Sequence, residues 1–190
     1  KKPKPKTEPT QPSQQVAKKQ ESIKEYPFLL GYRANVVDYS LASSTEDVTI
    51  SGQSLVGAVL RGQFPWRGGK VRVRGDFSSG TVFDDLDYLT HQVAGEYLYS
   101  VFSPRVSLLA GPYLRRHSIY SLAGDGQTLE GSTKSEFGAN IGMEGRWRVF
   151  DQVWGARGIY SLGGASGFDV SFYRRIWRVY QFEVGYESHE

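Results

Sequence analysis

Three aspartates stand shortly before a histidine in a polar stretch of the chain, at Asp84, Asp85, Asp87 and His91. Carboxylates beside an imidazole can polarise a water molecule, so this group could serve a hydrolase at the junction of a loop and a strand. Asp85 or Asp87 could equally bind calcium or a cation that bridges lipids. Neither chemistry requires this spacing, and acidic loop residues of this kind are common.

His117 and Ser118 form a second candidate, a base and a nucleophile for acyl transfer. Their spacing does not demand that chemistry either. The chain has no cysteine, and it contains no phosphate-binding loop, metal-binding signature or nucleophile elbow. We therefore expect no catalytic residue, no cofactor and no metal ion. If the chain forms a membrane β-barrel, as argued below, a protease or lipid-modifying hydrolase at the outer rim of that barrel stands as an alternative.

The clearest pattern in the sequence lies between residues 137 and 149. Its odd-numbered positions are apolar or glycine and end in Trp147 and Val149, whereas its even-numbered positions mix glycine with Asn140, Glu144 and arginines. A period of two indicates a β-strand with two different faces. One apolar face and one charged face are typical of a strand between lipid and a polar lumen.

The same alternation recurs in eight further runs, at about residues 30–36, 53–65, 71–76, 89–102, 106–115, 154–162, 168–175 and 180–187. Turn-forming residues separate the runs, and no helical periodicity is sustained. Since no stretch approaches 18 apolar residues, insertion into a membrane would have to use strands. The sequence predicts an all-β chain, folded as an antiparallel up-and-down β-barrel.

The polar faces of these runs carry arginine rather than lysine. Lys70 and Lys134 are the only lysines after residue 26, and arginine is the cation suited to partly buried pairing with carboxylates. This favours a barrel with its charges inside and its apolar faces in lipid over a soluble barrel. We expect a lumen charge network of Arg33, Arg61, Arg72, Arg74, Glu96, Arg115, Glu144, Arg146, Arg148, Arg157, Arg175 and Glu183, together with Asp76, Asp169 and Glu187.

Connection lengths and aromatic residues point the same way. Short turns are expected near 67–69, 103–104, 151–152 and 177–178, alternating with longer polar loops at 41–52, 79–88, 119–134 and 163–167. Outer-membrane barrels have short periplasmic turns and longer outer loops, with aromatic girdles at the interfaces. The expected girdle residues are Trp66, Trp147, Trp154, Trp177 and Tyr180.

On these features the chain resembles the small outer-membrane β-barrels of Gram-negative bacteria, the group that includes the transmembrane domain of outer-membrane protein A. The resemblance covers about residues 27–188 and lies in architecture, strand pattern and charged interior. It implies antiparallel strands, a lumen filled by side chains and a polar tether in the periplasm. Bacterial single-chain barrels have even strand numbers. Nine runs therefore lead to an expectation of about eight strands, with ten as the alternative.

Residues 1–26 differ from the rest in composition, with seven Lys, three Glu, four Pro and few apolar side chains. Such a segment cannot bury enough surface to fold alone. The remaining 16 of 23 basic residues are balanced by 17 of 20 acidic ones, so the positive charge belongs to the tail and no nucleic-acid partner is expected. We expect a disordered periplasmic linker at 1–26 and an outer-membrane barrel at 27–190.

The sequence thus predicts a structural anchor in the bacterial outer membrane. Its lumen is occluded by the charge network, and a narrow pore is a further alternative because arginines and glutamates could also line a gate. The expected partners are outer-membrane lipid and, through the linker, a periplasmic or cell-wall component.

Overall fold

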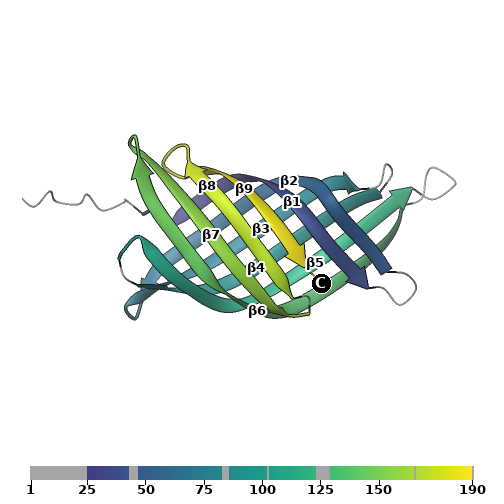
Figure 1. The fold of residues 1–190 in the computed structure, drawn as a ribbon, viewed down its shortest axis with the longest axis horizontal. Helices are drawn as coiled ribbons and strands as arrows, with labels where there is room; N and C mark the ends of the chain where they lie inside the picture. Colours follow the sequence, from purple (N-terminus) through teal and green to yellow (C-terminus); the bar gives the residue numbers. More distant parts are fainter. Residues whose placement is uncertain are drawn as a thin grey trace, which may run out of the picture.

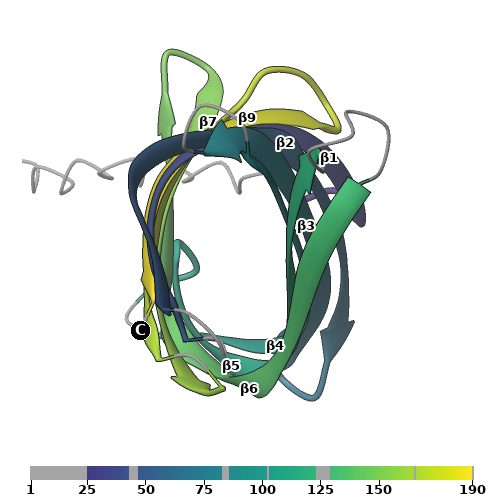
Figure 2. The same ribbon diagram turned by 90° about the vertical axis from the view of Figure 1, so that its right-hand side faces the viewer.

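Nine strands close into a barrel in the computed structural model, which describes residues 25–42, 47–82, 86–101, 103–122, 129–164 and 166–189 (Figures 1 and 2). No helix long and apolar enough to cross a membrane occurs in this part of the chain. The prediction of an all-β barrel is confirmed. The strands are β1 (Phe28–Ala42), β2 (Asp47–Trp66), β3 (Gly69–Val82), β4 (Leu86–Ser100), β5 (Val106–Leu122), β6 (Leu129–Val149), β7 (Gln152–Gly163), β8 (Gly167–Arg175) and β9 (Tyr180–His189).

The barrel closes where β1 pairs with β9, and this seam is parallel, whereas each strand pairs with its successor in antiparallel fashion. An up-and-down path of nine strands brings its first and last strands to the seam in the same direction. On the outer face, the rings of Tyr32 and Phe182 stack across the seam with centroids 5.9 Å apart. The expectation of purely antiparallel pairing is therefore wrong at this seam.

The expected strand number, eight or ten, is also wrong. The residue pattern contains nine alternating runs, and only the even-number rule of bacterial barrels argues against that count. The chain turns between β8 and β9, where the N–H groups of Ile176 and Trp177 donate to the Tyr180 carbonyl at 2.9 and 3.3 Å. Because the number is odd, β1 begins and β9 ends at opposite ends of the barrel (Figure 1).

The strands extend further than the alternation predicts. Residues 47–52 belong to β2, 79–82 to β3 and 129–134 to β6, all within regions expected to be long loops. In 129–134 polar residues occupy both parities, as Glu130 and Thr133 show, so the period-two signal fades there although the pairing continues. Ser118, for example, is still paired with Thr133. The tight turn near 151 is present as expected, with Phe150 and Asp151 at φ values of 47° and 61°.

The two faces of the sheet differ as the sequence predicts. Ile141, Met143 and Val184 point outward and are 48%, 52% and 42% exposed, whereas Arg146 and Glu183 are 7% and 0% exposed inside the barrel. A soluble barrel would have the opposite arrangement, with its apolar residues enclosed.

Inward-facing glycines make room for tyrosine rings in the lumen. Gly155 pairs with Tyr173 on β8, and a Cβ added at Gly155 would lie 2.2 Å from Cζ of that ring. Gly138 likewise pairs with Tyr113, and a Cβ added at Gly138 would lie 2.8 Å from Cε1 of that ring. Each ring therefore lies across a glycine on the neighbouring strand and fills interior space.

A side chain at Gly155 should displace Tyr173. We expect Gly155→Val to lower the free energy of unfolding by about 1–3 kcal/mol, the cost of overpacking, measured by urea denaturation of the folded barrel. Gly158→Val is the matched control, because nothing lies within 4 Å of a Cβ at Gly158. Equal losses for the two variants would contradict this account of the packing.

Candidate functional site

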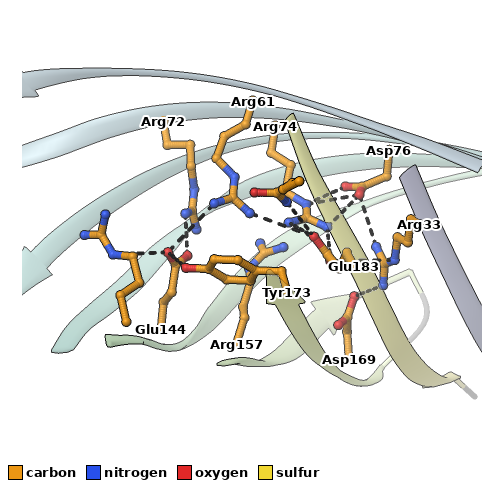
Figure 3. Close-up of polar contacts among 12 residues, drawn as sticks. Arg33, Arg61, Arg72, Arg74, Asp76, Glu144, Arg157, Asp169, Tyr173 and Glu183 are labelled. Carbon is orange, nitrogen blue, oxygen red and sulfur yellow. Dashed lines mark hydrogen bonds and ion pairs between the residues drawn. The ribbon is translucent and has the colours of Figure 1, made fainter. Parts of the chain in front are cut away.

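Buried charges fill the lumen along much of its length (Figure 3). Asp76 adds a carboxylate whose side chain is only 9% exposed. Cations and anions are thus nearly equal in number in the described lumen, which favours a self-neutralising network over a site for a charged ligand. The buried members are Arg33, Arg61, Arg72, Arg74, Arg115, Arg146 and Arg157 with Glu96, Glu136, Glu144, Asp169, Glu183 and Glu187.

Four of these residues, which we call the charge bridge, span the lumen: Arg72, Glu96, Glu144 and Arg157. Arg72 Nε donates to Glu96 Oε2 of the neighbouring strand at 2.6 Å. Arg72 also donates to Glu144 on β6, and Arg157 on β7 donates to Glu96 on β4. Since β3 and β6, like β4 and β7, are not adjacent in the sheet, these last two contacts cross the interior and close it.

Glu144 is the most connected carboxylate of the charge bridge. Tyr173 Oη donates to its Oε1 at 2.7 Å, and Arg146 Nε lies 3.7 Å from the same oxygen. The Arg61 guanidinium lies 5.2 Å from the centroid of the Tyr173 ring and 3.9 Å from Glu144. The negative charge of Glu144 therefore balances part of the positive charge of three arginines.

The middle of the lumen is tied to the seam. Arg74 forms a two-pronged contact with Asp76 at 2.7 and 2.8 Å, and its Nη2 also donates to Glu183 Oε1 at 2.7 Å. Arg33 donates to Asp169 Oδ2 at 2.7 Å and to Asp76 Oδ1 at 3.1 Å. These contacts join β1, β3, β8 and β9, so the charges connect strands that hydrogen bonding of the sheet does not.

We call the end where β1 joins β2 and β3 joins β4 the long-loop end of the barrel. Toward this end the interior becomes partly apolar. Val37, Tyr39, Leu55 and Tyr88 form a buried cluster there. Tyr39 donates to Glu187, and Tyr88 is bonded to His117. A second apolar cluster, of Leu98, Leu109 and Ile159, also points inward. Sequence reasoning missed these residues because it assigned polar character to the whole lumen, although the inward parity of positions 33, 35, 37 and 39 was available.

We call the opposite end, where β2 joins β3 and β6 joins β7, the short-turn end of the barrel. Its mouth holds the last residues of the expected linker. Glu25 is half-buried there and is paired with Lys70, while Arg146 Nη1 lies 2.7 Å from its Oε1. The Tyr26 ring lies 5.4 Å beneath the guanidinium of Arg175. Residues 1–24 lie outside the described part of the chain. No pattern in the residues predicts that Glu25 contacts the barrel, since it belongs to a segment of linker composition.

The expected network residues are almost all brought together in the lumen. Arg148 is the exception, because its side chain is exposed and lines a pocket at the short-turn end, while Arg175 is half-buried at the mouth. The girdle residues Trp66, Trp147, Trp154, Trp177 and Tyr180 all lie outward near that same end. Trp147 is paired with Trp154, and Trp177 stacks on Tyr180 with centroids 6.0 Å apart.

The acidic group near His91 is not assembled into a site by its described members. Asp84 and Asp85 lie outside the described residues. Asp87 is exposed and accepts a 3.3 Å hydrogen bond from Thr81. It stands four positions before His91 on the same strand, about 13 Å at 3.3 Å per residue, which is beyond hydrogen-bonding reach.

His117 and Ser118 point to opposite faces of β5. His117 lies in the lumen with Nε2 3.3 Å from Glu136 Oε2, whereas Ser118 Oγ bonds to Thr133 at 3.1 Å. They cannot act together on one substrate atom. Among the described residues, no group of three or more His, Asp or Glu side chains is placed to hold a metal ion.

Comparison of the chain with protein-family models, with curated proteins and with solved structures gives no match. The functional argument therefore starts from the lumen and the two rims.

Removing Glu144 should destabilise the barrel strongly, because it leaves several buried arginines undercompensated. We expect Glu144→Ala to lower the free energy of unfolding by about 3–5 kcal/mol, read from urea midpoints. Asp87→Ala, which removes an exposed carboxylate, should change it by about 0.5 kcal/mol or less. In a double-mutant cycle with Arg72→Ala, a coupling energy near zero would contradict the charge bridge.

Glu25 should make the barrel's stability sensitive to acid. Burial raises the pKa of Glu25, but the Lys70 hydrogen bond and the Arg146 charge outweigh it, so the pKa lies below the ordinary value. A lowered folded-state pKa gives stability that is present above the unfolded-state pKa and is lost as pH falls through the folded one.

Thermal unfolding of the native chain and of Glu25→Gln should therefore differ by about 1 kcal/mol or less at pH 7, a modest value because the site is partly exposed to solvent. The difference should shrink as pH falls below the unfolded-state pKa and vanish once Glu25 is protonated in the folded barrel as well. A difference that stays constant as the pH is lowered would show that the ion pairs of Glu25 contribute nothing.

Proposed function

We propose that this chain is an outer-membrane β-barrel whose role is mechanical: it anchors the linker at 1–26, and any domain before it, to the outer membrane. The observation that carries the proposal is the combination of an apolar exterior with a lumen closed by cross-lumen ion pairs. Such a barrel holds its place in a bilayer and offers no passage through its centre.

The exterior supports a lipid environment. Large apolar side chains on every strand point outward, including Leu60, Leu108, Ile141 and Phe172. In water this surface would be a contiguous apolar patch far larger than soluble monomers expose. In a bilayer the same surface is solvated by acyl chains, and the closed sheet leaves no unpaired strand edge within the hydrocarbon.

The lumen supports a closed anchor rather than a pore. On the long-loop side of the charge bridge, a cavity lined by Arg33, Asp76, Arg115 and Glu187 measures about 10 Å³, which is room for about one water molecule. Continuous passage of ions would require several buried ion pairs to break together, and leaving such charges unpaired is costly.

The attachment of the linker supports the direction of anchoring. The chain enters β1 at the short-turn end, where Glu25 is held by Lys70 and Arg146. Force applied to the linker would therefore act first on these ion pairs and then on the backbone hydrogen bonds that β1 makes with β2 and β9. If largely extended, the 24 residues before Glu25 could reach up to roughly 75 Å at about 3.1 Å per residue, long enough to contact a wall or periplasmic partner.

A charge on the outer face should impair membrane insertion. We expect Ile141→Arg to cost about 2–4 kcal/mol of folding free energy in phospholipid vesicles, because it places a guanidinium among acyl chains. Ser40→Arg, on the outward parity near the end of β1, should cost about 1 kcal/mol or less. If both variants fold equally well, the apolar band is not in lipid.

Planar-bilayer recording on the purified full chain, together with fractionation of cells, tests the anchor role. The proposal predicts that the chain sediments with the outer membrane, migrates faster on gels before heating than after it, and shows no steady conductance. Arg72→Ala/Glu144→Ala should open a measurable conductance, provided that the variant still migrates as a folded barrel. Steady conductance of the native chain would favour a pore, and recovery in the soluble fraction would overturn membrane anchoring.

A further inference from the structure

A pocket at the short-turn end is not used by the lumen network. It has a volume of about 220 Å³ and lies between the β6–β7 turn and the β8–β9 connection. Three arginines line it, Arg148, Arg175 and Arg178, which we call the arginine pocket. Asp151 is the one carboxylate among its described lining residues, so the lining carries an excess of two positive charges.

The surroundings add to this positive charge. Arg67 and Arg105 lie outside the pocket in two other short connections, β2–β3 and β4–β5. Within the short-turn rim, the arginine pocket is the place where three arginines line one cavity, so an anion at this rim is drawn there.

Apolar side chains flank the same pocket. Ile176 and Trp177 belong to its lining and are exposed, and Phe150 at the tip of the β6–β7 turn is 96% exposed. Guanidinium groups form paired hydrogen bonds with phosphate oxygens, while exposed aromatic rings favour the boundary between headgroups and acyl chains. A ligand that satisfies both features carries a phosphate attached to hydrocarbon.

We propose that the arginine pocket binds the phosphate of an anionic phospholipid in the leaflet at the short-turn end, with the acyl chains along Ile176 and Trp177. The proposal rests on the proposed function, since it requires the barrel to lie in a membrane. The site would fix the depth and rotation of the barrel at the rim from which the linker departs.

The test is competition for lipid by the purified full chain, folded in zwitterionic detergent micelles that contain equal amounts of phosphatidylglycerol and phosphatidylcholine. Native mass spectrometry counts the lipids that remain bound. We expect a preference for phosphatidylglycerol of about ten-fold or more, since each arginine near the membrane surface favours an anionic lipid over a zwitterionic one. Arg148→Gln/Arg175→Gln/Arg178→Gln should lose this preference.

The matched control is Arg67→Gln/Arg105→Gln/Arg116→Gln, which removes the same charge from exposed arginines outside the pocket. It should lose much less of the preference than the pocket variant, because these arginines do not line the pocket. Equal loss in both triple variants would overturn the site in favour of overall charge, and retention in the pocket variant would overturn it outright. If the pocket variant fails to fold, Arg178→Glu, in the β8–β9 connection, should reduce the preference by itself.

Inorganic phosphate distinguishes the source of the bound group. If millimolar phosphate displaces the lipid, the pocket recognises the free anion and the lipid-specific proposal is wrong. If phosphate leaves the lipid bound, the acyl chains contribute to binding as proposed. Failure of the proposed function has a different signature, because a chain that never enters vesicles would overturn membrane anchoring whatever the pocket binds in micelles.

Discussion

The structure depends on one constraint: arginine side chains buried inside the barrel must have polar partners, which are carboxylates for most of them and the Gln92 amide oxygen for Arg115. An unpaired charge away from water costs several kcal/mol, and seven buried arginines without partners would exceed the stability of an ordinary domain. The charge bridge meets this constraint by alternating cations and anions across the lumen. Because contacts such as that between Arg72 and Glu144 join non-adjacent strands, the same pairing that neutralises the interior also fixes the width of the barrel.

The parallel seam between β1 and β9 follows the same logic. Parallel pairs are slightly less stable per residue than antiparallel ones, and here side chains add to the backbone ladder. Arg33 lies opposite Glu183 inside the seam, and Asn35 Nδ2 donates to Glu187 Oε1 at 2.7 Å, with Tyr39 on the same carboxylate. An odd strand number is thus compatible with closure where the interior ties the first strand to the last.

The sequence predicts which residues share a face of each strand, but it does not predict which side chains make contact across the lumen. The period of two puts Ile141 and Glu144 on opposite faces, because parity is a property of the strand itself, and the arginine-rich composition of the Glu144 face favours it as the inner one. It cannot tell that Glu144 meets Arg72 across the lumen, since that contact depends on barrel closure. Val37 and Leu55 have inward parity but apolar character, so composition misplaces them. The even-number expectation failed because it came from a family resemblance rather than from the residues.

Orientation toward lipid can be measured directly, because the chain contains no cysteine and single spin labels can be placed at will. Labels at Ile141→Cys and Met143→Cys, with Ser166→Cys in the β7–β8 connection as a reference, would be compared in bilayers for collision with oxygen and with a water-soluble nickel complex. The account predicts that the two labels on β6 favour oxygen and are shielded from nickel, while Ser166→Cys shows the reverse. Nickel access at Ile141→Cys and Met143→Cys equal to that at Ser166→Cys would contradict it.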